Sequence, residues 1–277
     1  MDHCGSSLFD NWKMELKVFS NPADVARAAA QHFVEQHQRA VAASNGFAVA
    51  LSGGSTPRLL YELLANPREP FRDQIAWKKC FFFFTDERHV PPDHPDSNYR
   101  MAYETLFAHV PKTQVIRMAG EKPPEQAAEE YEHVLEEMYE DFPDLELVLL
   151  GLGEDGHTAS LFPGSRALQE TERLVVAPWV EKLNAYRITL TLPVINAGQS
   201  VLFLVTGTSK AEIVGEIIKT KERKTNLYQA EERYPAQGVC PTSGEVSWFV
   251  DEAAARLCST SNSSNAGAES DLLNRKP

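Results

Sequence analysis

The chain has few of the features that mark secreted or membrane proteins. It contains four cysteines in 277 residues and no C-x-x-C pair, so we expect free thiols in a reducing compartment. No apolar run reaches about 18 residues, which predicts no membrane span. The opening residues MDHCGSSLFD have neither a basic start nor an apolar core and do not resemble a secretory signal. These absences together predict a cytoplasmic protein.

Positive charge is also scarce. Lys and Arg number 27 against 39 Asp and Glu, giving a formal net charge of −12. A general nucleic-acid or anionic-membrane surface needs a basic face, so we expect neither partner. An anionic small molecule is still allowed, because a few local cations can outweigh the overall field at one site.

Apolar runs rich in aromatic and β-branched residues recur along the chain and predict strands. Several are apolar on both faces, which is typical of a covered parallel sheet. The five main runs are FAVAL (47–51), CFFFFT (80–85), LELVLLG (145–151), YRITLTL (186–192) and VLFLVTG (201–207), and two shorter candidates are LVVAPWV (174–180) and VSWFV (246–250).

Helical patterns lie between these runs. One helix is predicted to begin with Asn21 as its cap and Pro22 in its first turn, and the next with Thr56 as its cap. Alternating strands and helices predict an α/β fold with a mainly parallel sheet. No linker divides the chain, so we expect one domain over residues 1–258, followed by a small, polar, disordered tail over residues 259–277.

In open parallel sheets, ligands bind outside the carboxyl ends of the strands, and four unusual sequences follow predicted strands here. The first is SGGSTPR, residues 52–58. Its glycines allow close approach of the backbone to a ligand, and the helix that follows offers free N–H groups to a phosphate. The alternative is a tight turn without a ligand. A P-loop is excluded, because G-x-x-x-x-G-K is absent.

The second sequence begins with Asp86, Glu87 and Arg88 after four phenylalanines. Such dense charge after a buried strand indicates a site, although an exposed loop would also be charged. Metal ligation by His89 and His94 with Asp93 or Asp96 is an alternative interpretation of this sequence. Their spacing fits no established motif, so no metal site is predicted.

The third sequence is GLGEDGH, in which Gly151, Gly153 and Gly156 match the dinucleotide fingerprint. The match lies in mid-chain, a Pro-Gly soon interrupts the expected helix, and no acidic residue ends the next strand. Dinucleotide binding is therefore disfavoured. What remains is a glycine loop presenting Asp155 and His157, which suits a general base oriented by a carboxylate.

The fourth sequence is VTGTSK, in which Thr208 is predicted to cap a helix and Lys210 to lie in its first turn. A cation there opposes the helix dipole, and Arg58 is in the same position after Thr56. Two such cations near strand ends make sense if an anion binds between them. Arg187, at the start of a predicted strand, is a further candidate.

Five segments together resemble the glucosamine-6-phosphate isomerase/6-phosphogluconolactonase family. They occur in the family's order between about residues 18 and 257 and read LSGGSTP, TDERHVPPDHPDSNYRM, LGLGEDGHTASLFPGS, RITLTLPVINAG and WFVDEAAARL. The resemblance implies a modified doubly wound, Rossmann-like α/β domain with helices on both faces of the sheet. It also implies no organic cofactor, and a monomer or weak homo-oligomer is expected.

The resemblance assigns roles to named positions. It implies catalytic roles for His157, Asp155, Arg88 and Asp86, those of the last two being the least defined. It implies a sugar-phosphate site made by the remaining matched positions, namely Ser52, Gly53, Gly54, Ser55, Thr56, Ser97, Asn98, Arg187 and Lys210.

One position separates the two branches of the family. The deaminases carry a glutamate just before the Pro-Gly of the catalytic loop, whereas Phe162 stands here. The resemblance therefore implies the lactonase branch, which hydrolyses 6-phospho-D-glucono-1,5-lactone to 6-phosphogluconate in the oxidative pentose phosphate pathway. An isomerase or deaminase, a sugar-phosphate sensor and a nicotinamide-dependent dehydrogenase remain as alternatives at this point.

Overall fold

The main sheet of the protein is parallel and has seven strands in the order β1-β11-β10-β6-β2-β3-β5. The structure, a computed structural model, describes residues 14–139, 142–222, 234–241 and 243–258. The predicted tail lies outside these residues. The strands are β1 (Met14–Phe19), β2 (Phe47–Leu51), β3 (Cys80–Phe84), β5 (Gln114–Val115), β6 (Leu147–Leu150), β10 (Ser200–Val205) and β11 (Glu245–Asp251). The predicted α/β class with a mainly parallel sheet is confirmed.

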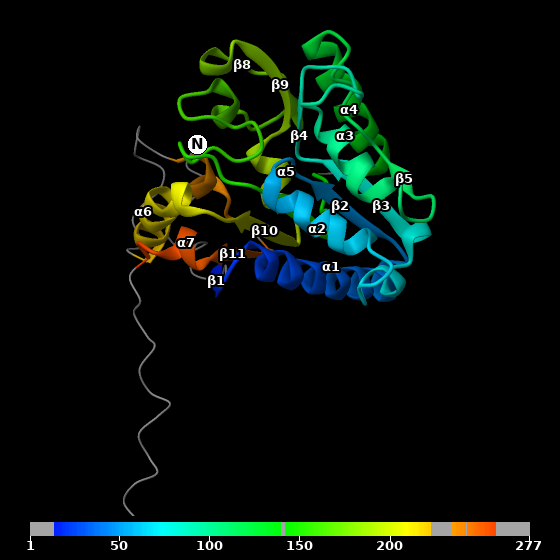
Figure 1. Ribbon diagram of the computed structural model, residues 1–277. Helices are drawn as coiled ribbons and strands as arrows, with labels where there is room; N and C mark the ends of the chain where they lie inside the picture. The colour runs from blue at the N-terminus through cyan, green and yellow to red at the C-terminus, as the bar shows by residue number, and fades with distance from the viewer. Residues whose placement is uncertain (1–13, 140–141, 223–233, 242, 259–277) are drawn as a thin grey trace, which may run out of the picture.

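A smaller antiparallel sheet stands beside the first, with the order β4-β9-β7 and with β8 also paired to β9. Its strands are β4 (Asp86–Arg88), β7 (Val175–Val176), β8 (Trp179–Val180) and β9 (Ala185–Leu190), and β8 and β9 lie at the top of Figure 1. The expectation that YRITLTL belongs to the parallel sheet was therefore wrong. Polar Arg187 and Thr189 alternate with apolar Ile188 and Leu190, which suits an antiparallel strand with one apolar face.

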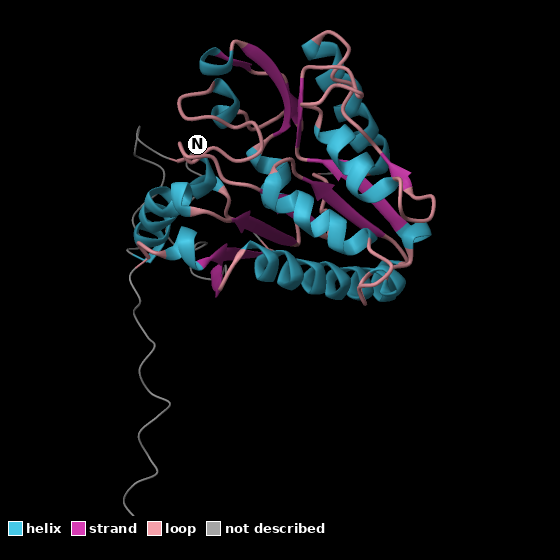
Figure 2. Ribbon diagram, in the orientation of Figure 1, coloured by secondary structure: helices cyan, strands magenta, loops and turns pink. Residues whose placement is uncertain are grey.

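Helices and short turns connect the strands (Figure 2). They are α1 (Pro22–Ser44), α2 (Ser55–Ala65), α3 (Asn98–Ala102), α4 (Pro124–Met138), α5 (Leu192–Ala197), α6 (Ala211–Glu222) and α7 (Glu252–Ala255), with shorter turns that include η3 (Tyr103–Phe107), η4 (Arg166–Gln169), η5 (Glu181–Leu183) and η6 (Thr208–Lys210). None of the helices in the described part of the chain has both the length and the apolar character needed to span a bilayer.

The predicted helix caps are partly confirmed. Asn21 caps α1, and its side chain accepts a hydrogen bond from the Asp24 N–H at 3.0 Å. The two other predicted caps were wrong, because the turns begin earlier, after Gly54 and Gly207. Both glycines have positive φ, 108° and 98°, a conformation that glycine adopts without strain. Lys210 consequently ends η6 and precedes α6.

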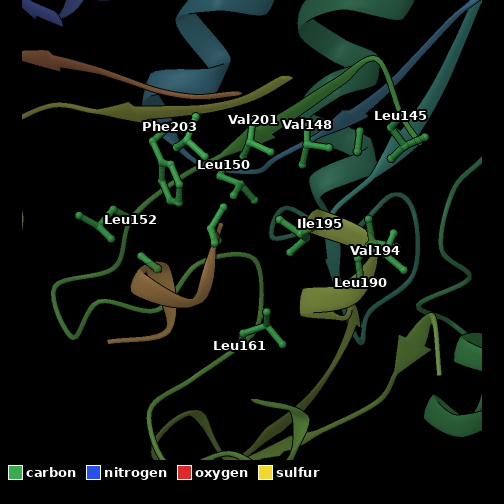
Figure 3. Close-up of a cluster of buried hydrophobic side chains, with 14 of the residues drawn as sticks. Leu145, Val148, Leu150, Leu152, Leu161, Leu190, Val194, Ile195, Val201 and Phe203 are labelled. Atoms are coloured by element: carbon green, nitrogen blue, oxygen red, sulfur yellow. The ribbon is translucent and has the colours of Figure 1, made fainter. Parts of the chain in front are cut away.

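Side chains of the parallel strands alternate between two buried cores, one on each face of the sheet. Helices α1, α2 and α3 cover one core, and α1 and α2 lie side by side in Figure 1. Helices α4, α5, α6 and α7 cover the other. In Figure 3, Val148 and Leu150 of β6 and Phe203 of β10 lie on the same side of the sheet as Ile195 of α5. The expected helices on both faces are confirmed.

The order of the strands reverses between β2 and β6. From β2 the chain adds β3 and β5 in one direction, and it then returns to build β6, β10 and β11 on the other side. Loops that follow neighbouring strands diverge at such a point, and ligands bind in the resulting crevice. The loops after β2 and β6 carry Ser52–Thr56 and Gly151–His157, so the fold brings two of the predicted sequences together.

Loss of a core aromatic side chain is predicted to destabilise this arrangement. Phe203 is fully buried and stacks on Trp248 with ring centroids 4.0 Å apart. Phe203→Ala should lower the free energy of unfolding by about 3–5 kcal/mol, measured by denaturant titration. Val18→Thr is a matched control on a strand, because Val18 is 50% exposed; equal losses in the two variants would contradict the assigned core.

Candidate active site

A cavity of about 350 Å³ opens where the parallel strands end, and all four predicted sequences line it. Thirteen positions were predicted as site residues, and ten of them line this cavity. They are Ser52, Gly53, Gly54, Ser55, Thr56, Asp86, Arg88, His157, Arg187 and Lys210. Asp155, Ser97 and Asn98 lie behind the lining.

The glycine loop forms one wall of the cavity. Its first residue is fixed by Tyr61 of α2, whose hydroxyl accepts from the Ser52 N–H at 3.1 Å and donates to the Ser52 carbonyl at 2.8 Å. The Thr56 and Thr206 hydroxyls lie 2.8 Å apart and join this wall to the end of β10. The amino-terminal end of α2 therefore faces the cavity beside hydroxyl groups, as an anion site requires.

The predicted Ser97 and Asn98 support this wall from behind. A Cβ atom at Gly53 would lie 2.0 Å from Asn98 Oδ1, so the glycine is needed to let that side chain pack against the loop. Asn98 Nδ2 donates to the Asp86 carbonyl at 2.9 Å. Ser97 Oγ donates to Glu87 Oε2 at 3.0 Å. The two residues are outside the cavity lining and bond to the neighbouring residues Glu87 and Asp86.

Glu87 organises the loop between β4 and α3, a role that the sequence did not predict. Its buried carboxylate accepts hydrogen bonds from the N–H groups of Arg88, Asn98 and Tyr99 at 2.7, 2.7 and 2.8 Å. Burial raises the pKa of Glu87, and these hydrogen bonds oppose the rise. Its neighbour Asp86, also buried, accepts from Ser160 Oγ at 2.7 Å.

Arg88 and Arg187 lie directly opposite each other on β4 and β9. Like charges in that arrangement repel, and burial together with the Arg88 guanidinium lowers the pKa of Arg187. Both residues line the cavity with Lys210, and none of the three forms a salt bridge within the described parts of the chain. An anion in the cavity would relieve this repulsion.

Arg58 does not belong to this group, contrary to the sequence-based expectation. Its Nε lies 3.1 Å from Glu62 Oε1, one helical turn further along α2. Its side chain lines a separate surface hollow with Arg72 and His109. The positive charge of Arg58 is therefore partnered on the outer face of the helix.

His157 and Asp155 form a close pair on the loop after β6, with Nδ1 and Oδ1 separated by 2.5 Å. A Cβ atom at Gly153 would lie 1.9 Å from His157 Nδ1, so only glycine leaves room for the imidazole. Ala159, two residues further along and also in the cavity wall, has φ of 46°, a left-handed conformation that is uncommon outside glycine. The loop is therefore built to hold the ring in one place.

The charges of this pair fix the tautomer of the histidine. Burial opposes ionisation of Asp155, but hydrogen bonds from Lys182 and His157 outweigh it and lower the pKa of Asp155 to about 2. An ionised carboxylate can only accept a hydrogen bond, so Nδ1 is the donor. Burial also lowers the pKa of His157, against the opposing effect of Asp155. At neutral pH, Nε2 therefore carries a free lone pair.

Two further side chains complete the site: Phe162, which the sequence placed in the catalytic loop, and Lys182, which it did not predict. Phe162 packs on His157 with ring centroids 4.3 Å apart. Lys182, from η5, contacts the Asp155 carboxylate and lies 4.6 Å from the Phe162 ring centroid. Lys182 is 27 residues from Asp155 in the sequence and lies in a polar turn. No sequence motif of known spacing links the two residues, so their contact could not be predicted.

Metal and dinucleotide binding receive no structural support. Within the described residues, no group of three or more His, Cys, Asp or Glu side chains is arranged to hold a metal ion. His89 Nε2 is hydrogen-bonded to the Lys122 carbonyl at 2.9 Å, while His94 Nδ1 accepts from the Asp96 N–H. The glycine loop at 151–156 continues into turns and not into the helix that would receive a pyrophosphate.

Residues 20–248 match the family described as glucosamine-6-phosphate isomerases/6-phosphogluconolactonase. The chain belongs to this family. The rat 6-phosphogluconolactonase is 38% identical over 251 residues, covering 88% of this chain and 93% of the relative. The 6-phosphogluconolactonase of the cyanobacterium Synechocystis is 40% identical over 223 residues, covering 78% and 86%.

A solved structure of a family member has the same fold. The 6-phosphogluconolactonase of Trypanosoma brucei superposes with a TM-score of 0.74 at 29% sequence identity, covering 88% of this chain and 98% of that chain. The two proteins therefore share one doubly wound α/β domain over most of this chain.

Asp155→Asn is predicted to lower the pKa of His157 further. The carboxylate stabilises the imidazolium through its charge and its hydrogen bond, and a neutral amide provides no such charge. The measurement is an NMR titration of the histidine ring protons, with the exposed His133 as an internal control. An unchanged or higher His157 pKa in the variant would show that the pair is not formed.

Proposed function

We propose that the protein hydrolyses 6-phospho-D-glucono-1,5-lactone to 6-phospho-D-gluconate, the second step of the oxidative pentose phosphate pathway. The observation that supports this most is a neutral, carboxylate-held histidine in the same cavity as three cations that form no salt bridge with any residue the structure describes. The names of the rat and cyanobacterial relatives agree with it. The proposed mechanism uses only side chains of this cavity and water.

The cations and the glycine loop would hold the phosphate of the substrate. A phosphate monoester carries about −1.5 to −2 charges at neutral pH, which suits Lys210, Arg187 and the amino-terminal end of α2. Charge-assisted hydrogen bonds to phosphate are stronger than neutral ones. Binding at this end would place the lactone ring toward His157 and reduce the entropy lost in reaching the transition state.

His157 would then act as a general base. Its Nε2 takes a proton from water as the water oxygen bonds to the lactone carbonyl carbon. Arg88 or a backbone N–H would stabilise the negative charge that develops on the carbonyl oxygen. As the bond from the carbonyl carbon to the ring oxygen breaks, His157 returns the proton to that oxygen. The products are a carboxylic acid, which ionises, and a free hydroxyl group.

Phe162 disfavours the alternative chemistry of amino-sugar isomerisation. The deaminase branch places a glutamate here to handle the ring-opening histidine, whereas an apolar ring now packs on His157. A phenyl group cannot accept or donate a proton. Release of ammonia from glucosamine 6-phosphate at rates comparable to lactone hydrolysis would contradict the proposal.

Three properties expected from the sequence stay predictions. They are location in the cytoplasm, the limits of the domain and a monomeric or weakly associated state.

His157→Ala is predicted to lower turnover by about 10²- to 10⁴-fold, the usual range for loss of a general base. The lactone is generated in situ from glucose 6-phosphate, the generating enzyme is removed, and acid release is followed against the spontaneous rate. Binding of 6-phosphogluconate should persist, because the cations are untouched.

His133→Ala is the matched control for this variant, since His133 is exposed on α4 and should keep full turnover. Turnover by His157→Ala at the wild-type rate would remove His157 from the mechanism. Binding of 6-phosphogluconate by a wild-type protein that does not accelerate hydrolysis would instead favour a sugar-phosphate sensor.

A further inference from the structure

Lys182 contacts both partners of the catalytic histidine. Its ammonium group donates to Asp155 Oδ2, while the other carboxylate oxygen, Oδ1, accepts from His157. The ammonium group also lies over the ring of Phe162, and Phe162 in turn packs on the imidazole of His157. The four side chains form a closed cluster in which the carboxylate is held between a cation and the imidazole.

The local fold explains how Lys182 reaches this cluster. It lies in η5, a turn that connects β8 to β9 and ends at Asn184, whose φ of 47° is left-handed. The Asn184 N–H donates to the Glu181 carbonyl at 3.0 Å and closes the turn. Trp179 and Tyr186 pair across the two strands with ring centroids 4.9 Å apart. The hairpin is thus fixed on both sides of the lysine.

The position of Lys182 separates it from the other cations of the cavity. Arg88 and Arg187 belong to the β4–β9 pair, and Lys210 follows β10. Each of these lines the cavity and has no salt-bridge partner among the described residues, whereas Lys182 is already paired with the Asp155 carboxylate. The geometry therefore assigns its charge to Asp155 and not to the phosphate of a substrate.

Three charged groups act on His157, and they oppose one another. Asp155 and the more distant Asp86 favour the imidazolium, whereas Lys182 disfavours it. Without Lys182, the effect of the two aspartates on the ring would be opposed less strongly. The Asp155 carboxylate would also lose the contact that keeps Oδ1 directed at Nδ1, and with it some control of the ring orientation.

We propose that Lys182 is a positioning residue, which holds the Asp155 carboxylate against His157 and keeps the imidazole unprotonated and available as a base. The inference rests on the proposed function of His157 as a general base. It extends that function by placing control of the base on the β8–β9 hairpin, a segment outside the catalytic loop. A substrate-free measurement can test it separately.

The first experiment is an NMR titration of His157 in the free protein, with its signal assigned by its loss in His157→Gln. Lys182→Met removes the charge but keeps a long apolar side chain over Phe162, and Lys182→Arg keeps the charge. Lys182 is half exposed, 50% for its side chain, so neither variant should impair folding. We expect a higher His157 pKa in Lys182→Met and a value close to wild type in Lys182→Arg.

The second experiment compares turnover of the same proteins with the lactone at pH 6 and pH 8. Lys182→Met should lose a larger fraction of kcat at pH 6, because more of its His157 is protonated there. Lys210→Met is the matched control, since Lys210 is not among the groups acting on His157. It should raise KM without changing how kcat depends on pH.

The outcomes are distinct. An unchanged His157 titration in Lys182→Met, together with a raised KM, would make Lys182 a phosphate ligand and overturn the inference. A shifted titration that Lys182→Arg restores would support it. If the titration shifts as expected but the wild-type protein does not hydrolyse the lactone, the electrostatic coupling stands and the proposed function fails.

Discussion

The close contact between His157 and Asp155 above Gly153 is the constraint on which the site depends. Nδ1 and Oδ1 are 2.5 Å apart, and the space beneath the ring is too small for a single Cβ atom. Ordinary side chains rotate among several rotamers, but this imidazole is confined by the loop below it and by Phe162 beside it. The confinement leaves Nε2 as the nitrogen that can act as the base in the proposed mechanism.

The topology of the sheet supplies the rest of the site. Strands β2 and β6 are neighbours at which the strand order reverses, so their loops open a crevice. The antiparallel pair β4–β9 then adds two arginines from the side. The cations and the imidazole come from separate elements: Lys210 and His157 follow the parallel strands β10 and β6, whereas Arg88 and Arg187 come from the antiparallel pair. The net charge of −12 is compatible with an anionic ligand because these few cations are concentrated in one cavity.

The sequence predicted the strands well where burial covers both faces. FAVAL and CFFFF are apolar throughout and coincide with β2 and β3. It failed for β1, whose residues are intermediate or exposed, and for the sheet to which β9 belongs, since strand pairing depends on distant parts of the chain. The predicted caps Thr56 and Thr208 were wrong because the helical turns begin earlier, directly after Gly54 and Gly207. The positive φ of these glycines cannot be recognised from the neighbouring residues.

For the site, motifs after strands predicted ten of the residues that line the cavity, since parallel strands end at one edge. They were not sufficient to separate Lys210, which lines the cavity, from Arg58, which turns to Glu62 on the outer face of α2. Ser97 and Asn98 lie outside the cavity lining, where Asn98 packs against Gly53 and Ser97 donates to Glu87, so their predicted contact with substrate stays a prediction. Lys182 was missed because its contact with Asp155 is made by tertiary structure alone.

The most direct test of this account is the tautomer of His157 in the free protein at neutral pH, read from the ¹⁵N chemical shifts of the two ring nitrogens. The account predicts a neutral ring with the proton on Nδ1 and a bare Nε2. A proton on Nε2, whether in the other neutral tautomer or in the imidazolium, would leave no base facing the cavity and would contradict the account.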